Sequence, residues 1–434
     1  PASPKNNLYP TGNHSPASAL APPTSHDPLD PLPVVANTIP RMNRRSFLAA
    51  SALAAASAPS LLAAPSGKHR VAVIGHTGRG NFGHGLDTVW LKIPKTEIVA
   101  VADKDEAGLK KELAKLKVDQ GFTDYRKMLG KVKPGFVAVC PRHADQHHDM
   151  ALAAIEAGAM GVYLEKPFCR TPAEADSLVA ACKKHGAKIA VAHRNRYHPA
   201  LQVIDKLIAE GGIGKLLEIR GRGKGDRRGG GEDLWVLGSH VLNLINYFGG
   251  APKSCSAVML NNGRRVTKAD VRKGAEGLGP LAGNELHARY EMSKGVIATF
   301  DSIANDGTRN AGFGLQLIGS EGIVNIQCDR KPVAHLSPGN PFQPSDKPRP
   351  WIPINSTGVG EPEGRPDVIA AVLNHVAPVR DLIDAATDNR KPLCDASDGR
   401  LTVEMICGVF ESHRQNGRAV SIPLAERGNA LTKL

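Results

Sequence analysis

From residue 69 onward, short and nearly continuous apolar runs alternate with amphipathic stretches. The runs HRVAVIG, TEIVAVAD, FVAVC, GVYLE and KIAVA predict buried strands. Helices are predicted between them at 106–116, near 149–158 and at 173–185. Because strand and helix alternate, the pattern predicts a doubly wound α/β (Rossmann) domain with a parallel sheet over 69–193.

The pattern changes beyond residue 194. Polar and apolar positions alternate between Gly, Asn and Ser turns in KLLEIRGRG, SCSAVML, NELHARYEM, GVIATFDSIA, GLQLIGSEGIVNIQ and PVAHLS. This spacing predicts an α+β domain with a mainly antiparallel sheet over 194–424. One late helix is predicted at 367–387, and 425–434 is predicted to be a tail.

The first 64 residues are predicted to be a targeting region and not part of a folded domain. Residues 1–41 are rich in Pro, Ser, Ala and Asn and are expected to be disordered, or an over-extension before a true start at Met42. Residues 42–64 pair Arg44 and Arg45 with a weakly apolar Ala/Ser/Leu stretch, and resemble a twin-arginine export signal. We therefore expect a periplasmic or otherwise exported protein. The alternative is a membrane anchor, but Pro59 interrupts the stretch, so no stable span is expected after cleavage.

Composition narrows the class of protein. The formal charge is +13, from 55 basic and 42 acidic residues, but no long basic run occurs and aromatic residues make up only 4%. We therefore expect no nucleic-acid partner. The cysteines form no CxxC pair, which excludes zinc-ribbon spacing and argues against a disulfide framework. They are Cys140, Cys169, Cys182, Cys255, Cys328, Cys394 and Cys407.

A glycine-rich turn, GHTGRGNFGHG, follows the first predicted strand. Gly75, Gly78 and Gly80 allow a tight turn in which a pyrophosphate approaches a helix N-terminus, although the usual spacing would place a glycine at Thr77. Asp103 ends the second strand, where a carboxylate accepts both hydroxyls of an adenosine ribose and repels a 2′-phosphate. This favours NAD over NADP, and the adjacent Lys104 weakens the preference.

A set of motifs in order is more specific. Glu165-Lys166-Pro167 follows a predicted strand, with Asp124-Tyr125, Pro141 and His147 before it and VAHRNRYHP, Gly212-Ile213-Gly214 and DASDGRLTVEMICGVFESHRQNGRAVSIPL after it. Over about 69–424 the chain resembles the glucose–fructose oxidoreductase, inositol dehydrogenase and MocA (Gfo/Idh/MocA) family. The resemblance implies that Lys166 lies beside the nicotinamide. It also implies that the cofactor site contains Thr77, Pro141, His147, Glu165, Lys166 and Arg196.

The family's Asp-x-x-x-His segment is altered in this chain. His240 is present and is the predicted general base, since an imidazole titrates near neutrality. Val236 stands where the aspartate is expected and Asn243 replaces a second aspartate, so Asp233 is the candidate orienting carboxylate. The alternative is that His240 only packs a helix start.

Two further groups of residues have competing interpretations. His143, His147 and His148 suggest a metal, but no carboxylate pair accompanies them at helical spacing, so no metal site is expected. The basic loop RGRGKGDRR at 220–228 suits an anionic substrate or is simply solvated charge.

The resemblance implies hydride transfer between tightly bound NAD(P) and a sugar or polyol carbon. A bound cofactor reduced and reoxidised within one cycle would suit a compartment where free cofactor is scarce. One alternative is a glycosidase that uses transient oxidation by NAD. Another is a non-catalytic ligand-binding relative. In the second domain, one sheet face would cover the cofactor cleft and the other would support a subunit interface, so a homo-oligomer is expected.

Overall fold

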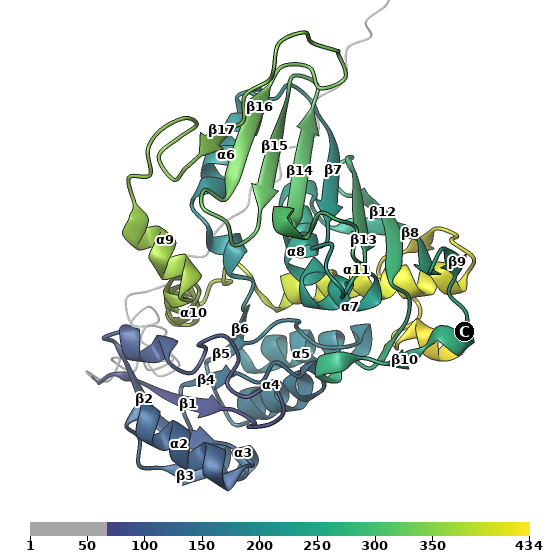
Figure 1. Ribbon diagram of the computed structural model, residues 1–434. Coiled ribbons are helices and arrows are strands. Elements are labelled where there is room, and N and C mark those ends of the chain that lie inside the picture. The colour runs from purple at the N-terminus through teal and green to yellow at the C-terminus, as the bar shows by residue number, and fades with distance from the viewer. Residues whose placement is uncertain (1–66) are drawn as a thin grey trace, which may run out of the picture. The chain divides into compact units, whose positions relative to one another are not determined.

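The computed structural model describes residues 67–434. The predicted export signal, with Arg44 and Arg45, and the predicted disorder at 1–41 lie outside these residues. The described chain contains two large sheets, each partly covered by helices (Figure 1).

The first sheet has six parallel strands in the order β3-β2-β1-β4-β5-β6. The chain reverses direction across the sheet between β1 and β4, and open α/β sheets bind ligands in the crevice at that point. This confirms the predicted doubly wound sheet. The strands are β1 (His69–Ile74), β2 (Thr96–Ala102), β3 (Gly121–Phe122), β4 (Phe136–Val139), β5 (Gly161–Leu164) and β6 (Lys188–Val191).

Three of the four α-helices of residues 69–193, which pack on this sheet, lie close to the predicted ranges. The four are α2 (Glu106–Leu116), α3 (Tyr125–Val132), α4 (His147–Glu156) and α5 (Pro172–His185). The ranges of α2, α4 and α5 were predicted, whereas α3 was not. Asp105, Asp124 and Thr171 cap α2, α3 and α5 by accepting bonds from backbone N–H groups of the first turn.

The crossover from β1 to β2 differs from the prediction. It contains no α-helix; turns lead only into a short 3₁₀ helix, η1 (Val89–Lys92). The sequence pattern suggested that the glycine-rich turn brings a pyrophosphate to a helix N-terminus. The structure has no α-helix at that position. The six residues Asn81–Leu86 include two glycines, Gly83 and Gly85, and these disfavour a helix in this stretch.

The second sheet has ten strands in the order β17-β16-β15-β14-β7-β13-β12-β8-β18, with β9 paired to β8. Only β7 and β13 pair in parallel, so the predicted mainly antiparallel sheet is confirmed. The strands are β7 (Leu216–Arg222), β8 (Pro252–Asn261), β9 (Arg264–Arg265), β12 (Glu285–Met292), β13 (Ile297–Ile303), β14 (Gly314–Gly319), β15 (Gly322–Gln327), β16 (Ala334–Pro338), β17 (Ile352–Ile354) and β18 (Val420–Ser421). A separate pair joins β10 (Arg272–Lys273) to β11 (Pro280–Leu281).

Helices connect this sheet to the first. The helix α8 packs on β7, β13 and β14, and α11 packs on β8 and also against α5 of the first sheet (Figure 1). The shared core thus fixes α8, which carries His240, relative to β5 and Lys166. These helices are α6 (Ala200–Ala209), α7 (Gly231–Val236), α8 (Gly238–Gly249) and α11 (Ala396–Arg414).

Two C-terminal predictions need correction. The predicted helix at 367–387 is broken into α9 (Pro366–Leu373) and α10 (Val376–Thr387), because His375 adopts a left-handed backbone with φ of 67°. The predicted tail at 425–434 packs against the body of the protein. There Leu431 is buried and Arg427 pairs with buried Glu404 at 2.6 Å.

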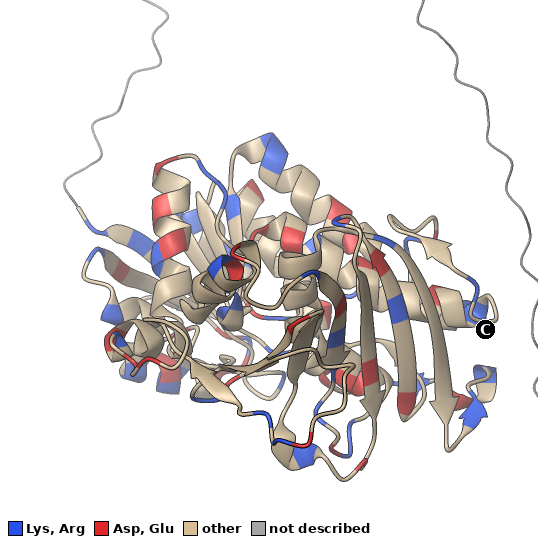
Figure 2. Ribbon diagram, turned by 90° about the horizontal axis from the view of Figure 1, so that it is seen from above, with Lys and Arg blue, Asp and Glu red and all other residues tan. Residues whose placement is uncertain are grey.

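Charge on the second sheet is mixed. Lys and Arg alternate with Asp and Glu along its strands (Figure 2). All seven cysteines are free thiols, and six of them are buried. Within residues 67–434, none of the helices has the length and apolar character needed to cross a membrane.

Candidate functional site

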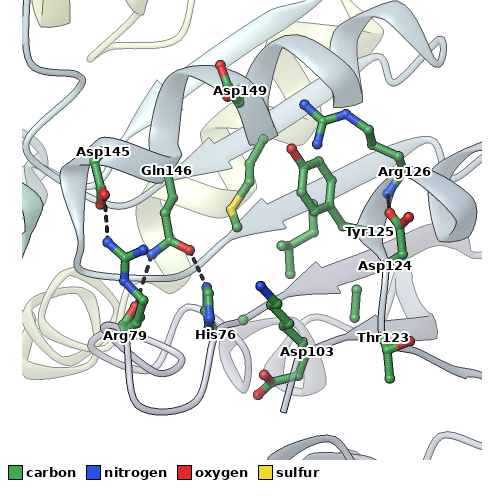
Figure 3. A pocket seen from close by; sticks show the side chains of 15 residues that line it. His76, Arg79, Asp103, Thr123, Asp124, Tyr125, Arg126, Asp145, Gln146 and Asp149 are labelled. Carbon is green, nitrogen blue, oxygen red and sulfur yellow. Dashed lines mark hydrogen bonds and ion pairs between the residues drawn. The ribbon is translucent and has the colours of Figure 1, made fainter. Parts of the chain in front are cut away.

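A cavity of about 450 Å³ lies at the carboxyl ends of the strands of the first sheet (Figure 3). It is at the edge where the chain reverses direction, as expected for a nucleotide crevice. Its lining combines residues from the β1 and β2 ends with the starts of α3 and α4. These are Ile74, Gly75, His76, Arg79, Ala102, Asp103, Lys104, Thr123, Asp124, Tyr125, Arg126, Asp145, Gln146, Asp149 and Met150.

The glycine-rich turn forms one wall of this cavity as a tight hairpin. His76 and Asn81 form an antiparallel bridge, and the Gly78 N–H donates to the Asn81 side chain at 3.0 Å. Gly80 has φ of 91°, and a Cβ there would lie 2.4 Å from the Arg142 nitrogen. Only glycine permits this backbone so close to the loop after β4.

Asp103 holds the hairpin to the end of β2. Its carboxylate accepts bonds from the Thr77 N–H at 3.0 Å, the Thr77 hydroxyl at 2.6 Å and the Asp105 N–H at 3.0 Å. The residue is buried and lies across the cavity from Asp149 (Figure 3). The Asp103 carboxylate was expected to bind a ribose. Thr77, at the position where a glycine is usual, uses part of the hydrogen-bonding capacity of this carboxylate.

The cavity has the features that a dinucleotide needs. Cations line it: Arg79 pairs with Asp145 at 2.6 Å, whereas Lys104 and Arg126 form no ion pair with any residue in 67–434. Asp145 Oδ1 in the lining, and His143 Nδ1 two residues earlier in the chain, are buried without a hydrogen-bond partner among the described residues. The residues present therefore fit an adenosine and its phosphates, although the glycine-rich turn itself leads into no α-helix.

The same loop continues to a second, smaller cleft of about 110 Å³ between the two sheets. A Cβ on Gly83 would lie 3.1 Å from Glu165 Oε2, and the next residue, His84, contacts Glu165 Oε1 at 3.2 Å. A molecule extended along the loop would therefore reach both cavities. The cleft is lined by His84, Glu165, Lys166, Ala192, Arg194, Leu237, His240, Asp329 and His375.

Lys166 and His240 meet in this cleft although 74 positions separate them in the sequence. Lys166 follows β5 and donates from Nζ to the Val236 carbonyl at 3.2 Å. Val236 ends α7, so the backbone at the position of the expected aspartate contacts the lysine. Both Lys166 and His240 are buried, which limits competition by water.

The neighbour of His240 is a second histidine. Their Nδ1 atoms lie 3.3 Å apart, and the rings meet edge to face with centroids separated by 5.0 Å. Burial lowers the pKa of His193 to about 3, and the charge of Lys166 adds to the effect. Burial, then His193 and Lys166, also lower the pKa of His240 well below its ordinary value. Both rings are therefore neutral near pH 7.

The opposite side of the cleft carries an anion. Burial alone would raise the pKa of Glu165, but the His84 hydrogen bond and the charge of Lys166 outweigh it and lower the pKa. Glu165 Oε2 has no partner within 67–434. The cleft therefore contains the buried Glu165 carboxylate and the Lys166 side chain beside two neutral imidazoles.

His375 completes the wall of the cleft. It accepts at Nδ1 from the Tyr163 hydroxyl at 2.5 Å, and burial lowers its pKa to about 4. The left-handed backbone between α9 and α10 is what turns His375 into this position.

Two predicted residues lie away from the cleft. Asp233 accepts from Ser302 Oγ at 2.7 Å and from the Lys224 N–H at 3.1 Å, so it does not orient His240. Arg196 donates to the Asn243 carbonyl at 3.0 Å and stacks 4.6 Å from the Tyr247 ring centroid. It lines neither cavity, so the structure does not place it at the cofactor. In both cases the sequence located the residue on a segment near the cleft. It could not show which way the side chain points.

His147 and Pro141 support the site from beneath. The two ring nitrogens of His147 contact the Pro141 and Pro167 carbonyls, each at 2.6 Å, and the side chain is fully buried. His147 thus ties the end of β4 to the residue after Lys166. Within residues 67–434 no group of three His, Cys, Asp or Glu side chains is arranged to hold a metal.

Sequence reasoning missed five residues that line or support the cleft: His84, His193, Arg194, Asp329 and His375. His193 and Arg194 stood in the quoted motif VAHRNRYHP, so this segment carried a usable signal. His84 also stood in a quoted motif, the glycine-rich turn GHTGRGNFGHG. Asp329 and His375 come from distant loops, and no spacing rule connects them.

Comparison with known proteins finds a family model that matches the part of the chain forming the first sheet. Residues 69–193 match the family described as "Oxidoreductase family, NAD-binding Rossmann fold" (GFO_IDH_MocA). Over 137 residues the chain is 30% identical to a D-apiose dehydrogenase of Paraburkholderia graminis, covering 32% of this chain and 36% of that protein. Over 264 residues it is 24% identical to a levoglucosan dehydrogenase of Pseudarthrobacter phenanthrenivorans, covering 55% of this chain and 66% of that protein. The matches thus span about one third to two thirds of these relatives.

The fold extends further than the sequence similarity. A solved levoglucosan dehydrogenase in complex with NADH and L-sorbose superposes with a TM-score of 0.65 at 19% identity. The match covers 82% of this chain and 100% of that one. Both sheets are therefore part of a shared fold.

Proposed function

We propose that this chain, whose residues 69–193 match the model of the Gfo/Idh/MocA NAD-binding oxidoreductases, transfers hydride between a nicotinamide cofactor and a CH–OH carbon of a sugar or polyol. The observation that carries the proposal is the convergence of Lys166 and His240 in a buried cleft connected by the glycine-rich loop to a nucleotide-sized cavity. The similarity to D-apiose and levoglucosan dehydrogenases supports a sugar as substrate.

In this proposal the cofactor is held by the hairpin of Gly75, Gly78 and Gly80, by Asp103 through Thr77, and by the end of β5. When bound, the nicotinamide supplies the hydride acceptor. The protein's own residues manage the alcohol proton. The Lys166 ammonium donates a hydrogen bond to the reacting oxygen and stabilises the negative charge that develops there.

His240 accepts the proton. A neutral imidazole is a base at one nitrogen only, and His240 Nδ1 faces His193 Nδ1 at 3.3 Å. If His240 donates from Nδ1 to His193, then Nε2 of His240 carries the free lone pair needed for proton abstraction. His193 thus does for His240 what the family's carboxylate would do. It is a positioning residue.

The cofactor is proposed to be NAD, with NADP as the alternative. Asp103 at the end of β2 would face a ribose 2′-phosphate with negative charge, which disfavours NADP. Lys104 and Arg126 line the same cavity and oppose this effect. Titration of the purified protein with NAD⁺ and NADP⁺ decides between them.

One experiment tests the enzyme proposal as a whole. Mass spectrometry of the cofactor released on denaturation identifies any bound dinucleotide, and a sugar and polyol panel is then followed by nicotinamide absorbance in single turnover. Net oxidation of a sugar supports the proposal, whereas release of free sugar from a glycoside without net redox change indicates a transient-oxidation glycosidase. Absence of any bound or bindable dinucleotide indicates a binding protein.

We also propose export by the twin-arginine route, on the basis of Arg44, Arg45 and the Ala/Ser/Leu stretch that follows them. Replacing both arginines by lysine should retain the protein in the cytoplasm, as measured by cell fractionation. Unchanged export of the double variant would refute this route.

A further inference from the structure

A third cavity, of about 500 Å³, lies on the loops of the second sheet beside the Lys166–His240 cleft. It is lined by Lys224, Asp226, Arg227, Asn305, Arg309, Asn310 and Arg330. We call it the basic pocket. Its four cations come from three loops: one after β7, one between β13 and β14, and one after β15.

Three of the four cations of the basic pocket are not neutralised by the described part of the protein. Lys224 pairs with Asp226 at 3.9 Å, whereas Arg227, Arg309 and Arg330 form no ion pair with any residue in 67–434. The Arg330 side chain donates to the Asn310 carbonyl, at 2.6 Å. The single acidic residue of the lining, Asp226, is held by Arg228 at 2.6 Å, a bond that lowers its pKa to about 2. Converging like charges repel one another, so this arrangement favours a bound anion.

The basic pocket adjoins the catalytic cleft through shared segments. Asp329 lines the cleft and pairs with Arg194 at 3.0 Å, and the next residue, Arg330, lines the basic pocket. On the other side, the Lys224 N–H is bonded to Asp233 of α7, directly before the helix that carries His240. The Phe313 ring, which ends the Arg309 loop, lies 6.0 Å from the His240 ring.

The sizes of the two cavities suggest a division of labour. The cleft, at about 110 Å³, is much smaller than the basic pocket, at about 500 Å³. A substrate whose reacting carbon lies in the cleft can therefore extend outward from the cleft. The neighbouring basic pocket has the room to receive it.

We infer that the sugar substrate carries an anionic group, a carboxylate or a phosphate, which binds Arg227, Arg309 and Arg330 while its CH–OH carbon lies between Lys166 and His240. This inference rests on the proposed function and adds the substrate class to it. Guanidinium groups bind carboxylate and phosphate through paired N–H donors, and both anions share this chemistry.

The test uses protein saturated with dinucleotide, so that the cofactor's own phosphates do not compete. Calorimetric titration with D-glucuronate, inorganic pyrophosphate and D-glucose at low salt distinguishes a carboxylate, a phosphate and a neutral sugar. At least one anion should bind more tightly than glucose, and added salt should weaken it. Each of Arg227→Ala, Arg309→Ala and Arg330→Ala should weaken that anion roughly tenfold.

Arg265→Ala is the matched control, since Arg265 is an exposed arginine outside all three cavities and should leave anion binding unchanged. The inference is overturned if neither anion binds, or if the three arginine variants bind it as the wild type does. Failure of the proposed function is recognised separately, because then no dinucleotide binds and no sugar changes its absorbance. The inference alone fails under one further outcome. In that outcome the Arg227/Arg309/Arg330 triple variant oxidises a neutral sugar at the wild-type rate and also shows no loss of activity on anionic sugars.

Discussion

The Lys166 ammonium donates a hydrogen bond to the Val236 carbonyl at 3.2 Å. The backbone at this position thus supplies an oxygen to the lysine even though the side chain cannot. A carbonyl is neutral, so it offers the lysine a hydrogen bond without a countercharge. The roles of Lys166 and His240 can be tested by substituting each residue in turn.

Lys166→Met and His240→Ala should each lower single-turnover rates by about 10²–10⁴-fold, the usual contribution of general acid–base groups. The bound dinucleotide should remain, since the first cavity is untouched. The double variant should lose little more than either single variant, because both residues serve one proton transfer. As a control, Asp233→Asn should affect the rate far less, because Asp233 bonds Ser302 and Lys224 instead of His240. A large loss with Asp233→Asn would contradict the geometry described.

His193→Ala should reduce the turnover number about tenfold or more while changing the Michaelis constant little, because His193 orients His240 without touching substrate. His193→Asn retains a side chain that can accept a hydrogen bond and should recover part of the rate. Equal activity of both variants and wild type would show that His240 needs no partner.

Asp103→Ala should weaken dinucleotide binding about tenfold, because the Thr77 N–H and hydroxyl both lose their acceptor and the hairpin loosens. Asp105→Ala is the comparison, since Asp105 caps α2 through the Gly108 N–H at 2.6 Å and lies outside the cavity lining. It should cost about 1 kcal/mol of stability and little affinity. Unchanged dinucleotide affinity in Asp103→Ala would refute the assigned role.

His147→Ala should lower the free energy of unfolding by about 2–4 kcal/mol, because a buried ring and its bonds to the Pro141 and Pro167 carbonyls are lost. Pro167 directly follows Lys166, so loss of its contact should also disturb the position of Lys166. The fold loss in turnover should therefore exceed the fold loss in dinucleotide affinity. Urea unfolding and single-turnover rates measure the two effects. His148→Ala, which removes a neighbouring half-buried histidine, serves as control.

Stability should fall in acid because of His375. Burial lowers its pKa from 6.5 to about 4, so the folded state favours the neutral form of the ring. Its contribution is complete above pH 6.5 and is lost as the pH falls from 6.5 towards 4, by about 3 kcal/mol in all. Urea unfolding at pH 7 and pH 4.5 should show a smaller difference for His375→Gln than for wild type. An identical difference would exclude this origin.

Much of the fold followed from the apolar pattern. The strand runs before residue 193 are buried on both faces, so they are continuous in the sequence and easy to recognise. The helix 106–116 was located at its observed bounds because Asp105 caps it and its apolar spacing is regular. The missing helix after the glycine turn was not foreseeable in this way, since the motif normally leads into one.

The site was recovered less completely, for a physical reason. Lys166 and His240 stand in recognisable motifs, but the partner of His240 depends on which way each side chain points across the interface between sheets. Asp233 and His193 both lay in quoted segments, and only three-dimensional packing separates the one that contacts Ser302 from the one that contacts His240. The break at His375 was missed, although its neighbours Asn374, Val376 and Pro378 are weak helix formers and carried a signal for it.

The seven free thiols offer a built-in reporter of how the molecule opens. Burial raises the pKa of Cys140 and Cys169 in the first part well above the usual range, and it also raises that of Cys255 in the second sheet. Since only a thiolate reacts with alkylating reagents, these cysteines are labelled only when their surroundings transiently unfold. Cys182, half-buried on α5, has a pKa raised to about 12 and stays comparatively accessible. Mass mapping of alkylated positions over time would therefore rank the local opening rates of β4, β8 and α5 without introducing a probe.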